Sequence, residues 1–167
     1  MFTTILLLAV PTAGFRLLGA LGVRRFARLR VCAAHGMAFM LCCTGLAHFL
    51  PDSVTALPSH DDLVAMVPPA VPFPDAVVHA TGVLEFLGAF GLVLARTRTV
   101  SGIGLAVLFV LLFPANVHAA VESVPFNGDP ATPLWFRLPE QVLFVTTALW
   151  SAGLTRRGRT AAPQADR

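Results

Sequence analysis

The sequence contains no lysine and has few charged residues of either sign. All twelve basic residues are arginine, and charged residues make up 13% of the 167 residues. A soluble domain normally carries about 25% charged residues, because its surface must be hydrated. Here 56% of the residues are hydrophobic and the mean hydropathy is +0.74. These values predict one compact domain whose main solvent is lipid.

The net charge of +3 does not indicate a nucleic-acid partner. The arginines stand in short clusters at the ends of hydrophobic segments, where lipid head groups are the expected partners. The use of arginine alone, together with abundant alanine, suggests a GC-rich bacterial genome. We therefore expect a protein of the bacterial cytoplasmic (inner) membrane.

The sequence has no CxxC motif, so it lacks the usual signature of a membrane dithiol relay. Its cysteines, Cys32, Cys42 and Cys43, all lie in one apolar segment. Thiols in such a run usually serve as small packing residues. Packing is therefore favoured over a redox role, and no catalytic disulfide is expected.

Five hydrophobic segments approach the length of about 20 residues that a membrane-spanning helix needs. They cover residues 2–23, 31–50, 76–95, 100–121 and 134–154. Pro11 and Arg16 interrupt the first segment, but it has neither a basic start nor a convincing cleavage site, so we expect an uncleaved helix. The predicted fold is an all-α, multi-pass membrane bundle with a four-helix core and one N-terminal helix.

The charges of the loops predict the orientation of the bundle. Arginines follow the first, third and fifth segments: Arg24, Arg25, Arg28, Arg30, Arg96, Arg98, Arg156, Arg157 and Arg159. The loops 51–75 and 122–133 carry acidic residues and no arginine. By the positive-inside rule, the N-terminus should lie outside and the C-terminus inside. This divides the chain into an N-terminal helix with a basic cytoplasmic loop (1–30), a four-helix domain (31–155) and a polar cytoplasmic tail (156–167).

The outer loop 51–75 is rich in proline, which removes backbone donors and fixes φ. It should therefore be stiff. Ser59, followed by Asp61 and Asp62, predicts the start of a short helix within it. The loop is either a lid over the outer half of the bundle or a rigid connection, and the sequence leaves both open.

Polar residues from four of the hydrophobic segments should meet in the outer half of the bundle. Ionisable side chains are costly in hydrocarbon, so such a group is a functional-site hypothesis. The candidate ligand-binding residues are His48, His79, Glu85, Asn116, His118, Arg137, Glu140 and Gln141. The catalytic residues, if any, are not identified by this pattern.

Several stretches of the sequence resemble the DoxX family of small bacterial membrane proteins. They are TGLAHFLP (44–51), MVPPAVPFPDAVVHATGVLEFLGAFGLVLARTR (66–98), FPANVHAA (113–120) and RLPEQ (137–141). The resemblance covers roughly residues 31–154 and implies a four-helix membrane core. Some members are membrane subunits of quinone-linked sulfur-compound oxidoreductases, others belong to oxidative-stress complexes, and most have no assigned activity.

Glu85 should lie near the middle of the bilayer, where a carboxylate must become protonated or find a partner. It could handle a proton or anchor a ligand, or it could form a structural hydrogen bond to Arg137, Gln141 or Asn116. Arg137 and Glu140 are three residues apart and are expected to form a local ion pair. An inward-turned Arg137 that balances Glu85 is the alternative.

Pro139 should fall in the first turn or so of the last helix, where proline is tolerated. Pro114 should free the carbonyl of Val110 and kink its helix, with Asn116 close enough to bond that carbonyl. The same break could instead admit a polar ligand.

His48, His79 and His118 lie at similar depth, but no metal-type spacing or cysteine partner accompanies them. We therefore expect no metal site and argue against haem. His35, near the cytoplasmic end of its segment, is expected to be structural.

The leading hypothesis is a DoxX-like membrane component linked to redox chemistry, with other oxidoreductase subunits as partners. It would bind a small apolar ligand in its outer half, and a quinone is the natural candidate. A proton-coupled or small-solute transporter and a non-catalytic assembly subunit are the alternatives. The sequence does not decide whether the protein is an enzyme.

Overall fold

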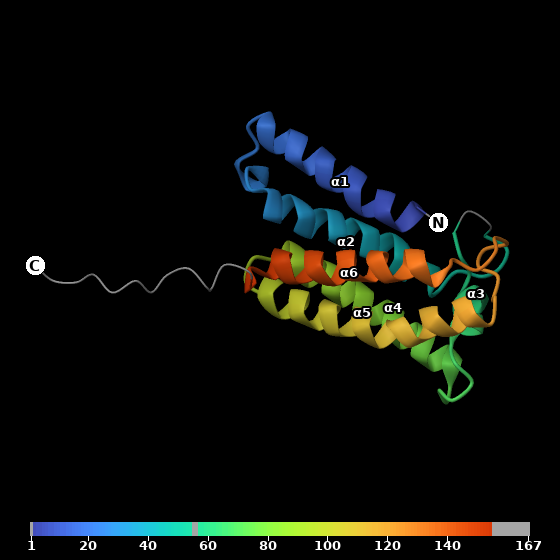
Figure 1. Cartoon of the computed structure of the whole chain (residues 1–167). Coiled ribbons are helices and arrows are strands. Elements are labelled where there is room, and N and C mark those ends of the chain that lie inside the picture. The colour runs from blue at the N-terminus through green and yellow to red at the C-terminus, as the bar shows by residue number, and fades with distance from the viewer. Residues whose placement is uncertain (1, 55–56, 155–167) are drawn as a thin grey trace, which may run out of the picture.

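The computed structural model describes residues 2–54 and 57–154, and this part of the chain is helical (Figure 1). Its elements are α1 (Thr3–Ala20), the 3-10 turn η1 (Arg24–Phe26), α2 (Leu29–Ala47), α3 (His60–Met66), α4 (Pro74–Val93), α5 (Arg98–Val121) and α6 (Leu134–Ala152). The all-α prediction is confirmed for these residues. The predicted tail 156–167, with Arg156, Arg157 and Arg159, lies outside the described residues.

Among the described residues, four helices are long and apolar enough to cross a membrane: α1, α2, α4 and α5. This agrees with four of the five predicted spans. The fifth, α6, has 19 residues but is less apolar. Arg137, Glu140 and Gln141 all lie in its first half and lower its mean hydropathy.

The long helices lie side by side, with α2 packed between α1 and α4 (Figure 1). Helix α5 packs along both α4 and α6. The core is built mainly from buried side chains of α2, α4, α5 and α6, such as Met37, Leu92, Leu105 and Ala148. Helix α1 contributes least to this core: among its described residues only Leu8 is buried in it, and Leu7 packs against it partly buried.

Small residues allow the helices of the core to approach closely. A Cβ atom added at Gly102 of α5 would lie 2.7 Å from the carbonyl oxygen of Ala148 in α6. At Gly82 of α4 it would lie 2.6 Å from the Cβ of His48. Both glycines therefore serve helix packing, as predicted for small residues in membrane bundles.

The η1 turn and the connection between α4 and α5 lie at the end of the bundle opposite α3 (Figure 1), and Arg24, Arg25, Arg96 and Arg98 lie in them or directly beside them. There the Arg98 guanidinium donates to the carbonyls of Leu92 (2.7 Å) and Val93 (3.2 Å), and Arg25 also donates to Val93 (3.2 Å). These carbonyls end α4, where the helix dipole favours a positive charge. The loops at the two ends of the bundle thus differ in charge, as the sequence of the loops predicts.

Candidate functional site

A cavity of about 510 Å³ lies at the α3 end of the bundle. Side chains from all six helices and from both loops at this end line it. Most of the lining is apolar. Its polar members include Thr4, Thr44, His48, Thr81, Glu85, Asn116, Asn127, Asp129, Thr132 and Arg137.

The proline-rich loop and α3 cover this cavity. Leu57, Leu63, Met66 and Val71 are among the residues by which they line it. Helix α3 begins as predicted, with Ser59 and Asp62 forming a reciprocal capping box. The loop therefore forms one wall of the cavity in addition to connecting α2 with α4.

Two histidines fasten this wall to the bundle. His60 Nδ1 donates to the carbonyl of His48 over 2.8 Å, and His118 Nδ1 donates to the carbonyl of Met66 over 3.2 Å. The first bond joins the start of α3 to the end of α2, and the second joins the end of α3 to α5. His118 thus acts on the wall of the cavity, since it does not itself line the space.

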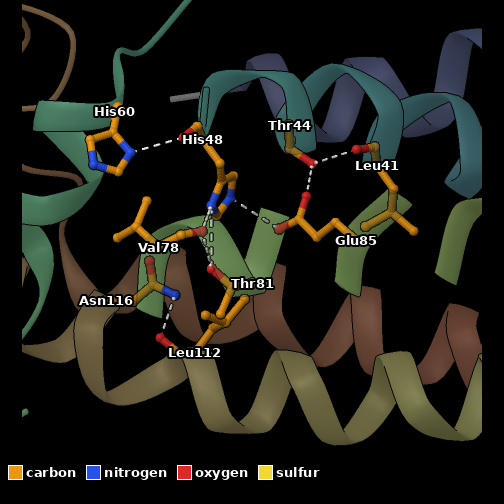
Figure 2. A network of polar contacts seen from close by, with 9 residues as sticks. All are labelled: Leu41, Thr44, His48, His60, Val78, Thr81, Glu85, Leu112 and Asn116. Carbon is orange, nitrogen blue, oxygen red and sulfur yellow. Dashed lines mark hydrogen bonds and ion pairs between the residues drawn. The ribbon is translucent and has the colours of Figure 1, made fainter. Parts of the chain in front are cut away.

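Glu85 is buried on α4, and its carboxylate faces α2 (Figure 2). Thr44 Oγ1 donates to Glu85 Oε2 over 2.6 Å, while His48 Nε2 lies 3.5 Å from Glu85 Oε1. The prediction that Glu85 is linked to a polar group on another helix is confirmed. Its partners are Thr44 and His48, and the candidates Arg137, Gln141 and Asn116 were wrong.

The other ring nitrogen of His48, Nδ1, also has polar partners. Nδ1 lies 2.7 Å from the carbonyl oxygen of Val78 and 3.3 Å from Thr81 Oγ1. The Thr81 hydroxyl itself donates to the Val78 carbonyl over 2.8 Å. The buried His48 side chain therefore bridges the carbonyl of Val78 and the carboxylate of Glu85, which lies about two turns further along α4 (Figure 2).

A second buried carboxylate, Glu140 of α6, is bound by groups of its own. Arg137 Nη1 lies 3.5 Å from Glu140 Oε2, and the Thr4 hydroxyl of α1 donates to Oε1. The Arg137 guanidinium also lies over the ring of Phe126, 5.8 Å from its centroid. The predicted local ion pair between Arg137 and Glu140 is confirmed. The alternative, in which Arg137 balances Glu85, is wrong.

The two carboxylate groups face a smaller cavity of about 110 Å³. It shares six lining residues with the large cavity: Thr4, Thr44, Glu85, Leu112, Asn116 and Arg137. Glu140 and Gln141 line only the smaller cavity and not the large one. The Gln141 amide donates to the carbonyl of Phe109. Six of the eight residues predicted to converge thus line one or both of these cavities, and His79 and His118 line neither.

Two predictions about prolines need correction. The Asn116 amide donates to the carbonyl of Leu112 over 3.4 Å, not to that of Val110, because Leu112 is the residue four positions earlier on the same helix face. Pro139 is the sixth residue of α6, so it lies in the second turn. It therefore removes the helical donor for the carbonyl of Trp135, which the first turn would not have required.

The predicted convergence of three imidazoles is wrong. His79 is exposed and its Nδ1 donates to the carbonyl of Asp75, so its ring lies outside both cavities. His48, His79 and His118 thus bind three different backbone carbonyls. Within residues 2–54 and 57–154 no group of three His, Cys, Asp or Glu side chains is placed to hold a metal ion.

His35 lies away from the site, packed edge-on against Phe15 and Phe26, and its Nδ1 donates to the carbonyl of Val31. Its contacts agree with the structural role expected for it. Cys32, Cys42 and Cys43 are free thiols, and only Cys43 reaches a cavity.

Three residues of the site, Thr4, Thr44 and Thr81, were not predicted from the sequence. A signal for two of them is present, since Thr44 precedes His48 by four residues and Thr81 precedes Glu85 by four. Residues at this spacing share a helix face. A hydroxyl one turn from a buried ionisable residue is therefore a candidate partner in apolar helices.

Residues 37–152 match the family described as Domain of unknown function (DUF8561). Because the match covers most of the chain, the protein belongs to this family. The matched region contains both cavities' lining from α2 to α6, whereas α1, which contributes Thr4, precedes it. No curated protein and no solved structure matches the chain.

Proposed function

We propose that this chain is a DoxX-like, multi-pass membrane component linked to redox chemistry that binds a small, mostly apolar ligand such as a quinone. The observation that carries this proposal is the large cavity. Its volume of about 510 Å³ lies within the range of roughly 300–1,000 Å³ typical of small-molecule sites. Its apolar walls with a few polar groups suit a molecule that is mainly hydrophobic and polar at one end.

The charges around the cavity favour a neutral ligand. Arg137 is paired with Glu140, His48 lies within ion-pair distance of Glu85, and the remaining charged residue of the lining, Asp129, is exposed. A charged ligand would add an unpaired charge to a space of low polarity, which is strongly unfavourable. The resemblance to the DoxX family supports the link to redox chemistry and to oxidoreductase subunits as partners.

The direct test is to identify the molecule that the protein carries from its native membrane. The full chain is purified in mild detergent, extracted with organic solvent and analysed by mass spectrometry. We expect an isoprenoid quinone at about one molecule per protein chain. The control is the ratio of quinone to phospholipid in the total membrane extract, and a preparation not enriched above that ratio would contradict the proposal.

A transporter is the second candidate, because the contact between His48 and Glu85 places two proton-binding groups at the cavity. A solute gradient that drives proton movement in vesicles containing the purified protein would favour this class. Vesicles with Glu122→Gln, which changes an exposed carboxylate outside both cavities, provide a matched control.

The proposed orientation places the N-terminus and α3 outside and the arginine-rich end inside the bacterial cytoplasmic membrane. The position of Arg25 and Arg98 at the end of the bundle opposite α3 supports it. Reporter fusions at Asp62, Arg98 and Arg159 are expected to read outside, inside and inside. A cytoplasmic signal from the Asp62 fusion would reverse the orientation and place the cavity at the inner face.

A further inference from the structure

We infer that His48 and Glu85 hold a single proton between them and use it to bind an oxygen atom of the ligand. The ligand class is then a neutral, mostly apolar molecule with a carbonyl oxygen at its polar end. This inference rests on the proposed function, since it concerns the same cavity. It adds a named donor and a dependence of binding on pH.

The first step concerns His48 Nδ1. It lies 2.7 Å from the carbonyl oxygen of Val78, which can only accept a hydrogen bond. Nδ1 must therefore carry a proton. In a neutral imidazole only one nitrogen is protonated, so the other nitrogen, Nε2, would then be a bare acceptor.

The second step concerns Nε2 and the carboxyl group of Glu85. Nε2 lies 3.5 Å from Oε1, and both side chains are at least nine-tenths buried. Without a further proton, a lone pair on Nε2 would face a carboxylate, which is repulsive. One more proton turns the contact into an attraction, either as an imidazolium beside a carboxylate or as a carboxylic acid beside an imidazole.

The neighbouring groups leave this proton to the pair. Thr44 donates to Glu85 Oε2, so the position available to a proton or an acceptor is Oε1. Across the smaller cavity, Arg137 and Glu140 compensate each other. On α3, His60 donates to the backbone carbonyl of His48 and does not reach its ring.

The pair is positioned to offer its proton to a ligand. His48 and Glu85 both line the large cavity, and Glu85 lies where the two spaces meet. A carbonyl oxygen in the cavity can accept a hydrogen bond from the protonated pair. When the pair loses its proton, the donor disappears and a negative charge remains, so affinity for the carbonyl compound should fall as pH rises.

The test compares two probes of similar apolar bulk that differ in oxygen content, decylubiquinone and decylbenzene. Their equilibrium binding to the full chain in lipid nanodiscs is measured from mildly acid to alkaline buffer. For the native protein we expect the affinity for decylubiquinone to fall about tenfold or more, because hydrogen bonds to charged groups contribute at that level. Affinity for decylbenzene should stay constant.

Glu85→Gln is the decisive variant. A glutamine fits the same space, since its carbonyl can accept from Thr44 and its amide can donate to a bare His48 Nε2. We expect this variant to fold and to bind decylubiquinone with no pH dependence. Glu122→Gln, which changes an exposed carboxylate outside both cavities, should behave as the native protein.

The outcomes separate this inference from the proposed function. A native protein that binds neither probe would overturn the proposed ligand-binding role itself. Binding of decylubiquinone that does not depend on pH, or a pH dependence that persists in Glu85→Gln, would overturn the inference alone. If size-exclusion chromatography shows that Glu85→Gln does not fold, the double variant His48→Gln/Glu85→Gln, which removes both proton-binding groups, is measured in its place, with the same expectation.

Discussion

Replacing Arg137 with leucine is expected to lower the free energy of unfolding by about 3–5 kcal/mol, because it leaves a buried carboxylate without its cation. Glu140 is 4% exposed, and its partners are Arg137 and the Thr4 hydroxyl. After the substitution only the hydroxyl remains. Unfolding in mixed detergent, followed by circular dichroism, measures the loss.

Two further variants show whether the loss comes from the ion pair. Arg16→Leu removes an exposed arginine of α1 and should change stability little. Adding Glu140→Gln to Arg137→Leu should recover part of the loss, since no carboxylate is then left unpaired. A double variant as unstable as the single one would mean that Arg137 stabilises the fold through its packing on Phe126.

The same measurement addresses the relation between Arg137 and Glu85. The structure assigns these residues to separate groups, one with Glu140 and one with Thr44 and His48. Their substitutions, Glu85→Gln and Arg137→Gln, should therefore be additive within about 0.5 kcal/mol. A larger coupling would indicate that the small cavity between them transmits an interaction.

The positions of the helices along the chain could be predicted from the sequence, because they depend on the local pattern of hydrophobic and polar residues. The predicted starts of the second to fifth segments lie within two residues of those of α2, α4, α5 and α6. Ser59 and Asp62 predicted α3 because a capping box is a local interaction. The Arg137–Glu140 pair was predictable for the same reason, since residues three apart meet on a helix surface.

The partners of Glu85 were not accessible, because hydropathy predicts the depth of a residue but not the direction in which its helix faces. Arg137 was the plausible cation by elimination, yet its own neighbour Glu140 binds it. His79 and His48 were predicted at the same depth. His79 lies on the exposed face of α4, whereas His48, at the end of α2, contacts the buried face of α4. The direction that each side chain takes from its helix decides which of them reaches the cavity, and the absence of a side chain at Gly82 lets His48 pack closely against α4.

Filling the cavity is expected to have the largest effect on ligand binding. Ala115 of α5 lines the large cavity, so Ala115→Trp would place an indole in the space that the proposed ligand occupies. We expect affinity for decylubiquinone to fall by a hundredfold or more, about 2.8 kcal/mol, because most of the apolar contact area of the ligand is lost. Binding in nanodiscs measures this loss.

Val110→Trp is the matched control, because Val110 lies on the same helix, is 58% exposed and lines neither cavity. It should bind decylubiquinone as the native protein does, which separates the filling of the cavity from the presence of an additional indole. Ala115→Trp must also elute as a folded protein. If it folds and still binds decylubiquinone with native affinity, the ligand lies elsewhere on the bundle, and the group formed by Glu85, His48 and Thr44 is a structural link between α2 and α4.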